Sequence, residues 1–254
     1  MTVAKDFARE GLLRFDPGLA DAVLAGAIAE VAGLLEEEDR VLDAWPTCPS
    51  VRAIALAPRV LGLLGEIYGR APRPFQTLNF SVGTEQAPHA DTVHFNSDPP
   101  TFMCGVWVAL EDVDEDSGPV VYYPGSHLLP EYAPHDYGAP PGAEHYDRYE
   151  AFVRDLIDRE GLRPEVATLR RGEAILWAAN LLHGGAPRRD PGRTRHSQVT
   201  HYFFAGCRYW TPLDSSPGAR AHRRPRFVTD RPRWRDRLRR RPWTPDRPVR
   251  RPVA

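Results

Sequence analysis

The chain has 254 residues, of which 42% are hydrophobic and 26% charged, and its formal net charge is −1. This is the composition of an ordinary globular domain, and the balanced charge argues against a protein that binds nucleic acid or membranes by electrostatic attraction alone. Three widely spaced cysteines without a CxxC pair argue against a disulfide framework and a thiolate zinc site; they are Cys48, Cys104 and Cys207. We find no signal-like N-terminus and no apolar stretch of membrane-spanning length, so we expect a soluble, cytoplasmic protein.

The first part of the chain, residues 1–73, is predicted to be mainly helical. Asp16 is a suitable N-cap for a helix with Pro17 at its first position, and apolar residues then recur at helical spacing between Leu19 and Leu35. A second helix is predicted over Pro58–Tyr68. Gly69 follows it directly and is the expected C-terminal stop.

From Pro74 onward the pattern changes to short runs rich in Val, Phe, Tyr and Trp, separated by Gly, Pro and Asp turns. Helices followed by many short strands are typical of a β sandwich or barrel, so we expect a mainly β protein with flanking α-helices. We expect one domain over residues 1–254, with its core at residues 74–206. The predicted strands are Phe75–Val82, Phe102–Leu110, Val120–Tyr123, Glu165–Leu169, Ala174–Trp177 and Gln198–Phe204.

Two segments differ from the predicted core. An insert at about residues 128–163 contains one predicted helix, Tyr149–Arg159. Because a loop of this length inside a compact domain usually serves as a lid or a binding loop, we expect the insert to cover the site. The segment 207–254 is rich in Arg and Pro and is predicted to be a partly ordered tail.

A candidate metal site begins with His89 and Asp91. Residues i and i+2 of an extended strand point to the same face, so both side chains can reach one ion. A His-x-Asp pair is common by chance, however, and a second pair, His145 and Asp147, occurs in the insert. The pair alone therefore does not define a site.

The context of the first pair is more specific. His183 follows the apolar strand Ala174–Trp177 and precedes Gly184 and Gly185, which we expect to leave space beside it. Two imidazoles and one carboxylate form the facial triad that is typical of non-haem iron(II) oxygenases. His89, Asp91 and His183 are therefore the predicted metal ligands.

A carboxylate-binding pair is predicted at the start of the last core strand. Arg195 and Ser197 are two residues apart, so on a strand they would face the same side. Arg binds carboxylates through a fork of charge-assisted hydrogen bonds, which is what the distal carboxylate of 2-oxoglutarate requires. Arg193 is the competing choice.

A set of motifs between about residues 75 and 205 resembles the phytanoyl-CoA dioxygenase (PhyH-like) family. The resemblance implies a double-stranded β-helix, that is a cupin-like jelly roll, with iron(II) held by the three predicted ligands. It also implies 2-oxoglutarate and dioxygen as cosubstrates. The motifs are His89-Ala90-Asp91, Trp107-Val108-Ala109-Leu110-Glu111-Asp112, Gly118-Pro119, Pro124-Gly125-Ser126-His127, His183-Gly184-Gly185 and Arg195.

The resemblance further implies roles for residues around the metal. Arg195 is similar to the family's 2-oxoglutarate-binding Arg, Trp107 to a Trp that lines the cosubstrate pocket, and Asn79 to an Asn that contacts 2-oxoglutarate. The chain departs from the family pattern in two places. The spacing from His183 to Arg195 is about one residue longer than usual, and a cosubstrate-binding Ser is replaced by Gly185, so Ser197 or water is the expected substitute.

The substrate is a small molecule whose identity the sequence does not specify. Gln76 and His94 are candidate substrate contacts, although each residue also suits a position exposed to solvent. We predict an iron(II)- and 2-oxoglutarate-dependent dioxygenase that hydroxylates an unactivated C–H bond of a metabolite or biosynthetic intermediate. Asp91 favours hydroxylation over halogenation, because halogenases of this superfamily replace the carboxylate ligand with a small residue.

Several alternatives stay open at this point. Desaturation, cyclisation and epimerisation would use the same residues and cofactors. A zinc hydrolase or isomerase in the same jelly roll would have no use for Arg195 or Trp107. A binding module whose basic tail contacts nucleic acid or an acidic carrier would show no turnover and a steep loss of affinity with salt.

Overall fold

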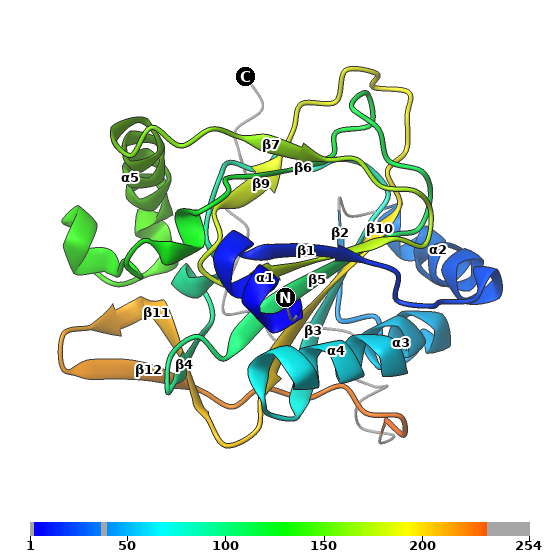
Figure 1. Cartoon of the computed structure of the whole chain (residues 1–254), viewed down its shortest axis with the longest axis horizontal. Coiled ribbons are helices and arrows are strands. Elements are labelled where there is room, and N and C mark those ends of the chain that lie inside the picture. Colours follow the sequence, from blue (N-terminus) through cyan, green and yellow to red (C-terminus); the bar gives the residue numbers. More distant parts are fainter. Residues whose placement is uncertain (1–2, 37–39, 233–254) are drawn as a thin grey trace.

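The structure is a computed structural model that describes residues 3–36 and 40–232. Two antiparallel sheets face each other (Figure 1). The larger sheet has the strand order β1 (Leu12–Phe15), β8 (Ala174–Ala178), β5 (Met103–Ala109), β10 (Ser197–Phe204), β3 (Pro72–Phe80) and β2 (Arg40–Leu42). The smaller sheet has the order β7 (Glu165–Ala167), β6 (Val120–Tyr122) and β9 (His183–Gly185).

The larger sheet has two differently covered faces, because successive side chains of a strand alternate between them. Val106 and Val108 of β5 pack against the helices, which lie on the opposite side of the sheet from β6, β7 and β9 (Figure 1). Trp107 faces the space between the two sheets, together with Val120 and Ala167 of the smaller sheet. The helices are α1 (Val3–Glu10), α2 (Asp21–Leu35), α3 (Pro49–Ala55) and α4 (Pro58–Tyr68).

All six predicted strands are present, with ends that differ by up to three residues from those expected. The helix α4 is also confirmed, and Gly69 ends it in the left-handed conformation with φ 65°. The predicted cap at Asp16 is wrong, because α2 begins at Asp21. Asp16 instead accepts a 2.7 Å hydrogen bond from the backbone N–H of Gly18, so the Asp-Pro-Gly sequence forms a turn ahead of the helix.

The insert contains α5 (Tyr146–Arg159), which begins three residues earlier than expected. Its Val153 and Leu156 pack with Val93 and Leu182 in one apolar cluster. This packing places the helix beside the segments that carry the predicted metal ligands. The short 3-10 helices of the chain are η1 (Asp91–Val93), η2 (Ser126–Leu128), η3 (Pro134–Tyr137) and η4 (Ala143–His145).

Two expected boundaries need correction. The segment 1–73 is not purely helical, since it also contains β1 and β2, the two edge strands of the larger sheet. These strands pair with β8 and β3. The segment 207–254 was expected to be a tail, but β11 (Arg208–Ser216) and β12 (Ala219–Arg223) form a sheet with β4 (Asn96–Asp98). These strands form because β4 offers an edge from a distant part of the chain. The remainder of the expected tail, residues 233–254, lies outside the described residues.

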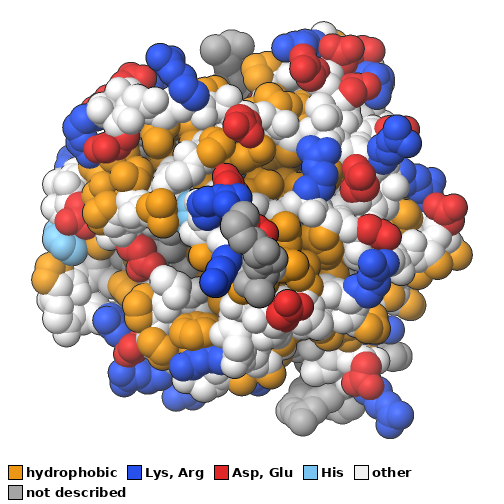
Figure 2. Space-filling view, in the orientation of Figure 1, with side chains coloured by type: hydrophobic (Ala, Val, Ile, Leu, Met, Phe, Trp, Pro, Cys, Tyr) orange, Lys and Arg blue, Asp and Glu red, His pale blue; other side chains and the backbone are white. Residues whose placement is uncertain are grey.

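The surface agrees with the near-neutral charge of the chain. On the face seen in Figure 2, basic side chains are interspersed with Asp and Glu side chains. Within the part of the chain that the structure describes, no helix has both the length and the apolar character needed to span a bilayer.

Candidate metal centre

The structure brings the three predicted metal ligands together. His89 and His183 form an antiparallel bridge in which each backbone N–H donates to the other's carbonyl at 2.9 Å. Asp91 Oδ1 lies 3.9 Å from the Nε2 atom of each ring, and the ligand atoms of all three residues lie within 4.8 Å of one another. The three residues are buried, with exposed fractions of 7%, 3% and 7%. This donor set of two imidazoles and one carboxylate suits iron(II).

The backbone route to this cluster differs from the one expected. Asp91 does not share a strand with His89 but begins η1, where the amides of His94 and Phe95 bond back to the Asp91 carbonyl. A turn therefore directs the carboxylate toward the imidazoles, because the strand pairing ends at His89. The second His-x-Asp pair, in the insert, is not part of any cluster of metal-ligating side chains among the described residues.

The sequence predicts that Gly184 and Gly185 leave open space beside His183, and this prediction is wrong. A Cβ atom at Gly184 would lie 2.6 Å from the carbonyl oxygen of Gln86, and one at Gly185 would lie 2.8 Å from the backbone nitrogen of Glu85. The two glycines are needed because the backbone that leads into His89 passes directly over them.

Backbone carbonyls orient both imidazole rings. His89 Nδ1 lies 3.1 Å from the Ala87 carbonyl, and His183 Nδ1 lies 2.9 Å from the Leu181 carbonyl. An N–H on each Nδ1 leaves the Nε2 lone pair of each ring able to bind a metal, although the Gln86 side-chain amide lies 3.5 Å from His89 Nε2. Burial, together with neighbouring His183, lowers the pKa of His89 to about 3, so this ring is neutral.

Two further side chains hold Asp91, and the sequence analysis missed both roles. Trp177 Nε1 donates a 2.8 Å hydrogen bond to Asp91 Oδ2, and His201 Nε2 lies 3.5 Å from the same oxygen. Burial alone would raise the pKa of Asp91, but the nearby His201 and His183 rings hold it well below its ordinary value. The carboxylate is therefore ionised, with Oδ1 directed at the two metal-binding rings.

The signal for His201 was present in the strand alternation. His201 lies two residues from Val199 of the inner cluster on β10, so both side chains point between the sheets. Gln76 is its cross-strand partner, and Gln76 Oε1 lies 2.8 Å from His201 Nδ1. Gln76, predicted to contact substrate, thus reaches the metal centre through His201.

The predicted carboxylate-binding pair lies at the start of β10. Arg195 is 3% exposed, and its guanidinium lies 5.4 Å from the centre of the Trp107 ring. Its Nη2 donates to the Val82 carbonyl at 3.2 Å, while its Nε has no partner among the described residues. Ser197 is fully buried, and its hydroxyl also lacks a hydrogen-bond partner there.

These unpartnered groups are chemically suited to an anion. Burial lowers the pKa of Arg195 to about 10, an effect that Glu111 opposes, so the guanidinium stays charged at neutral pH. A buried cation is costly without an anion, and a carboxylate would satisfy both Arg195 and Ser197. The competing Arg193 instead donates a 3.0 Å hydrogen bond to Asp114 on the surface, which leaves Arg195 as the arginine that faces the interior.

The geometry corrects the expectation for Asn79. Asn79 pairs with Gln198 across β3 and β10, and its Nδ2 donates to Gln198 Oε1 at 3.3 Å. Gln198 in turn donates to the Val51 carbonyl of α3, so this pair faces the helices. Asn79 therefore points away from the space that holds Trp107, because neighbouring Leu78 and Phe80 occupy the inner face.

We call residues 89–95, which carry two of the predicted ligands and η1, the metal turn. His94, the other candidate substrate contact, lies between this turn and the insert. Its ring stacks on Tyr146 at the start of α5, with centroids 5.3 Å apart and planes 21° apart. The Phe95 ring beside it lies 5.3 Å from the His201 ring. His94 is thus partly buried against the insert, and its contact with a substrate remains a prediction.

Known proteins share sequence similarity with this chain. The sequence model of the family described as Phytanoyl-CoA dioxygenase (PhyH) matches residues 15–197. The mouse protein "Phytanoyl-CoA dioxygenase domain-containing protein 1" is 25% identical over 191 residues, which cover 73% of this chain and 60% of that protein. The rat "Phytanoyl-CoA dioxygenase, peroxisomal" is 27% identical over 126 residues, which cover 48% of this chain and 34% of the enzyme.

Solved structures share the fold. The 2-oxoglutarate-dependent epimerase SnoN from nogalamycin biosynthesis superposes with a TM-score of 0.68 at 24% identity, covering 90% of this chain and 95% of SnoN. EctD from S. alaskensis, solved with 2-oxoglutarate and 5-hydroxyectoine, gives a TM-score of 0.62 at 18% identity, covering 89% and 84%. The predicted jelly-roll fold is confirmed. The family match extends over most of the chain, which therefore belongs to the phytanoyl-CoA dioxygenase (PhyH) family.

Proposed function

We propose that this chain is an iron(II)- and 2-oxoglutarate-dependent dioxygenase that hydroxylates an unactivated C–H bond of a small metabolite or biosynthetic intermediate. One observation carries the proposal. The jelly roll combines a buried His-Asp-His cluster with a buried Arg Nε and a buried Ser hydroxyl that have no hydrogen-bond partner among the described residues. The first group suits a divalent metal, and the second suits a carboxylate.

The residues have separate tasks in this proposal. His89, Asp91 and His183 would hold the iron, while Arg195 and Ser197 would bind the distal carboxylate of 2-oxoglutarate beside Trp107. A bound iron(II) ion would activate dioxygen, the oxidant, and 2-oxoglutarate would supply two of the electrons as it is decarboxylated to succinate. The chain contributes binding and orientation, and the burial of all three ligands excludes bulk water.

The type of oxidation is supported by the ligand set. Asp91 is present and ionised, which leaves no ligand position for a halide in place of the carboxylate. Desaturation, cyclisation and epimerisation remain alternatives with the same residues, and similar solved structures include an epimerase and a carbocyclase. A zinc hydrolase or isomerase is less well supported, because it gives the buried Arg195 no anion to bind.

The first test is spectroscopic and requires no substrate. Iron(II) and 2-oxoglutarate are added to the protein without oxygen, and the weak visible charge-transfer band of a chelated 2-oxo acid is recorded. The band is expected in the wild type and in Arg193→Ala, and it should be lost in Asp91→Ala and Arg195→Ala. Tight retention of zinc without a band would overturn the oxygenase proposal in favour of the hydrolase or isomerase.

The second test identifies the reaction. Candidate metabolites are screened for those that stimulate succinate formation, and the product is analysed by mass spectrometry. A product that gains one oxygen atom from labelled dioxygen supports hydroxylation. Loss of two hydrogens would instead indicate desaturation or cyclisation, and an unchanged mass with altered stereochemistry would indicate epimerisation.

A further inference from the structure

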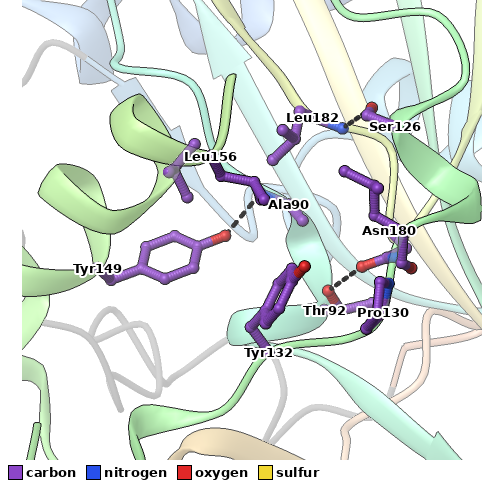
Figure 3. Close-up of a pocket in the computed structure, with 11 residues that line it drawn as sticks. Ala90, Thr92, Ser126, Pro130, Tyr132, Tyr149, Leu156, Asn180 and Leu182 are labelled. Atoms are coloured by element: carbon purple, nitrogen blue, oxygen red, sulfur yellow. Dashed lines mark hydrogen bonds between the residues drawn. The ribbon is translucent and has the colours of Figure 1, made fainter. Parts of the chain in front are cut away.

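A tyrosine hydroxyl of the insert accepts a hydrogen bond from the backbone of the metal turn. The backbone N–H of Ala90 donates a 2.9 Å hydrogen bond to Tyr149 Oη, which comes from α5 (Figure 3). Ala90 lies between the two predicted ligands His89 and Asp91. Tyr149 is only 3% exposed, and burial raises the pKa of its hydroxyl, so the group is a neutral phenol.

The amides of the metal turn take their acceptors from different parts of the fold. His89 N–H bonds to the His183 carbonyl, and Thr92 N–H bonds to the Ala179 carbonyl. Both of these acceptors belong to backbone near β8 and β9. Ala90 instead depends on a side chain 59 residues away in the insert. Because a buried amide without an acceptor is costly, this hydrogen bond ties the shape of the turn to the position of α5.

Packing holds the Tyr149 hydroxyl in place. Its ring lies 5.7 Å from the ring of Tyr137 and 5.4 Å from that of Tyr146, measured between centroids. Tyr146 stacks on His94, so the same aromatic group contacts the metal turn on both sides of η1. The position of Tyr149 is thus set by the insert as a whole.

A second hydrogen bond, from a residue just before the insert, holds the backbone beside the predicted ligand His183. Ser126, immediately before the insert, accepts a 2.9 Å hydrogen bond through its Oγ from the backbone N–H of Leu182, the neighbour of His183 (Figure 3). Ala90, Ser126, Tyr149 and Leu182 line a small pocket between the insert and the predicted ligands (Figure 3). Thr92 and Asn180, which also line this pocket, are joined by a 3.0 Å side-chain hydrogen bond. Side chains that line this pocket therefore form hydrogen bonds with the backbone segments that carry the predicted ligands.

We propose that Tyr149 is a positioning residue of the metal centre, through which metal affinity depends on the insert helix and the order of the insert helix depends on the metal. This inference rests on the proposed function only in that the triad must bind a divalent metal. Without the phenol oxygen, the metal-free turn relaxes until the Ala90 amide finds another acceptor. Metal binding then has to restore the turn, so affinity falls, and by thermodynamic reciprocity the metal no longer stabilises α5.

The experiment compares Tyr149→Phe with a matched control, Tyr137→Phe. Both changes remove one phenol oxygen from the same aromatic group, but the Tyr137 hydroxyl has no hydrogen-bond partner among the described residues. Iron(II) affinity is measured by anaerobic titration, and hydrogen exchange of residues 146–159 is followed with and without metal. Tyr149→Phe should weaken iron(II) binding by about tenfold to 100-fold, as loss of an outer-shell contact does elsewhere. Tyr137→Phe should leave the affinity unchanged.

Hydrogen exchange separates positioning from a general loss of stability. Iron(II) should slow exchange in α5 of the wild type and of Tyr137→Phe, and should do so much less in Tyr149→Phe. The inference is overturned if all three proteins bind iron(II) equally, or if iron(II) leaves α5 exchange unchanged in the wild type, where folding of a variant is not in question. A wild type that binds no divalent metal would instead overturn the proposed function itself.

Discussion

The two ends of the space between the sheets treat their polar groups differently. At the metal end, the ligands already have partners: Trp177 donates to Asp91, and backbone carbonyls accept from His89 and His183. At the other end, the Nε of Arg195 and the hydroxyl of Ser197 are buried without partners among the described residues. Both ends are equally enclosed, so burial does not explain the contrast.

The difference indicates what each end is suited to bind, a metal ion at one end and a carboxylate at the other. The metal end is pre-arranged, so its geometry requires little adjustment when an ion binds. The Arg195 end contains buried polar groups without hydrogen-bond partners among the described residues. Each such group lowers the free energy of unfolding by roughly 1–3 kcal/mol, a cost that a bound carboxylate would offset. The predictions below test this contrast, beginning with the largest expected effect.

Removing a ligand should abolish function at the metal end. His183→Ala is expected to lower metal-dependent decarboxylation of 2-oxoglutarate by on the order of 1000-fold, because each ligand contributes several kcal/mol to metal binding. Succinate formation gives the rate, with His135→Ala in the exposed part of the insert as the control. Near wild-type turnover in His183→Ala would show that His183 is not a metal ligand.

Removing the buried cation should separate stability from binding. Arg195→Met is expected to raise the free energy of unfolding of the cosubstrate-free protein by about 1–3 kcal/mol, since an unpaired buried charge is replaced by an apolar side chain. The same change should weaken 2-oxoglutarate binding about 100-fold or more, from the loss of a bidentate charged contact. Denaturant unfolding and titration measure the two effects. A less stable variant that still binds 2-oxoglutarate would contradict the contrast between the two ends.

Removing the donor to Asp91 should loosen the metal end without emptying it. Trp177→Phe retains an aromatic ring but loses the N–H that holds Asp91 Oδ2, so metal affinity is expected to fall about tenfold. Trp45→Phe is the matched control, because Trp45 is equally buried but lies in the helix-side core. Equal metal affinities in the two variants would show that the Trp177 hydrogen bond is unimportant for the ligand geometry.

The smallest effect on function is expected from Asp43, which follows β2. Burial raises the pKa of Asp43 from 3.8 to about 6, although the hydrogen bond that its carboxylate accepts from the Thr77 amide opposes the shift. The folded state therefore binds a proton that the unfolded state has released, so stability from this group is lost as pH rises from 3.8 through about 6.

The variant Asp43→Asn keeps the acceptor oxygen for Thr77 and removes the charge. It should flatten this part of the pH profile of unfolding and raise the free energy of unfolding at neutral pH by about 1–3 kcal/mol. The affinity for 2-oxoglutarate should not change. An unaltered pH profile would show that Asp43 is not the group that titrates.

The sequence by itself determined the elements whose signals are local. The six core strands follow from alternating β-type runs bounded by turn residues, and Gly69 marks the end of α4 because it permits a positive φ. The His-Asp-His cluster was also identifiable as a candidate metal site, since few residue types bind iron and the surrounding motifs resemble one family. Arg195 could be named on the same basis, although Arg193 stayed open beside it.

Only the tertiary structure decided which distant residues meet. Trp177 reaches Asp91 across 86 positions, and Tyr149 reaches Ala90 across 59, through strand pairing and helix packing that no local pattern records. The alternation of β3 placed Asn79 and Leu78 on opposite faces, but the helices determined which face is the outer one. The physical reason is that a strand has two equivalent sides until its neighbours cover one of them, so the register and the covering layers assign each side chain its surroundings.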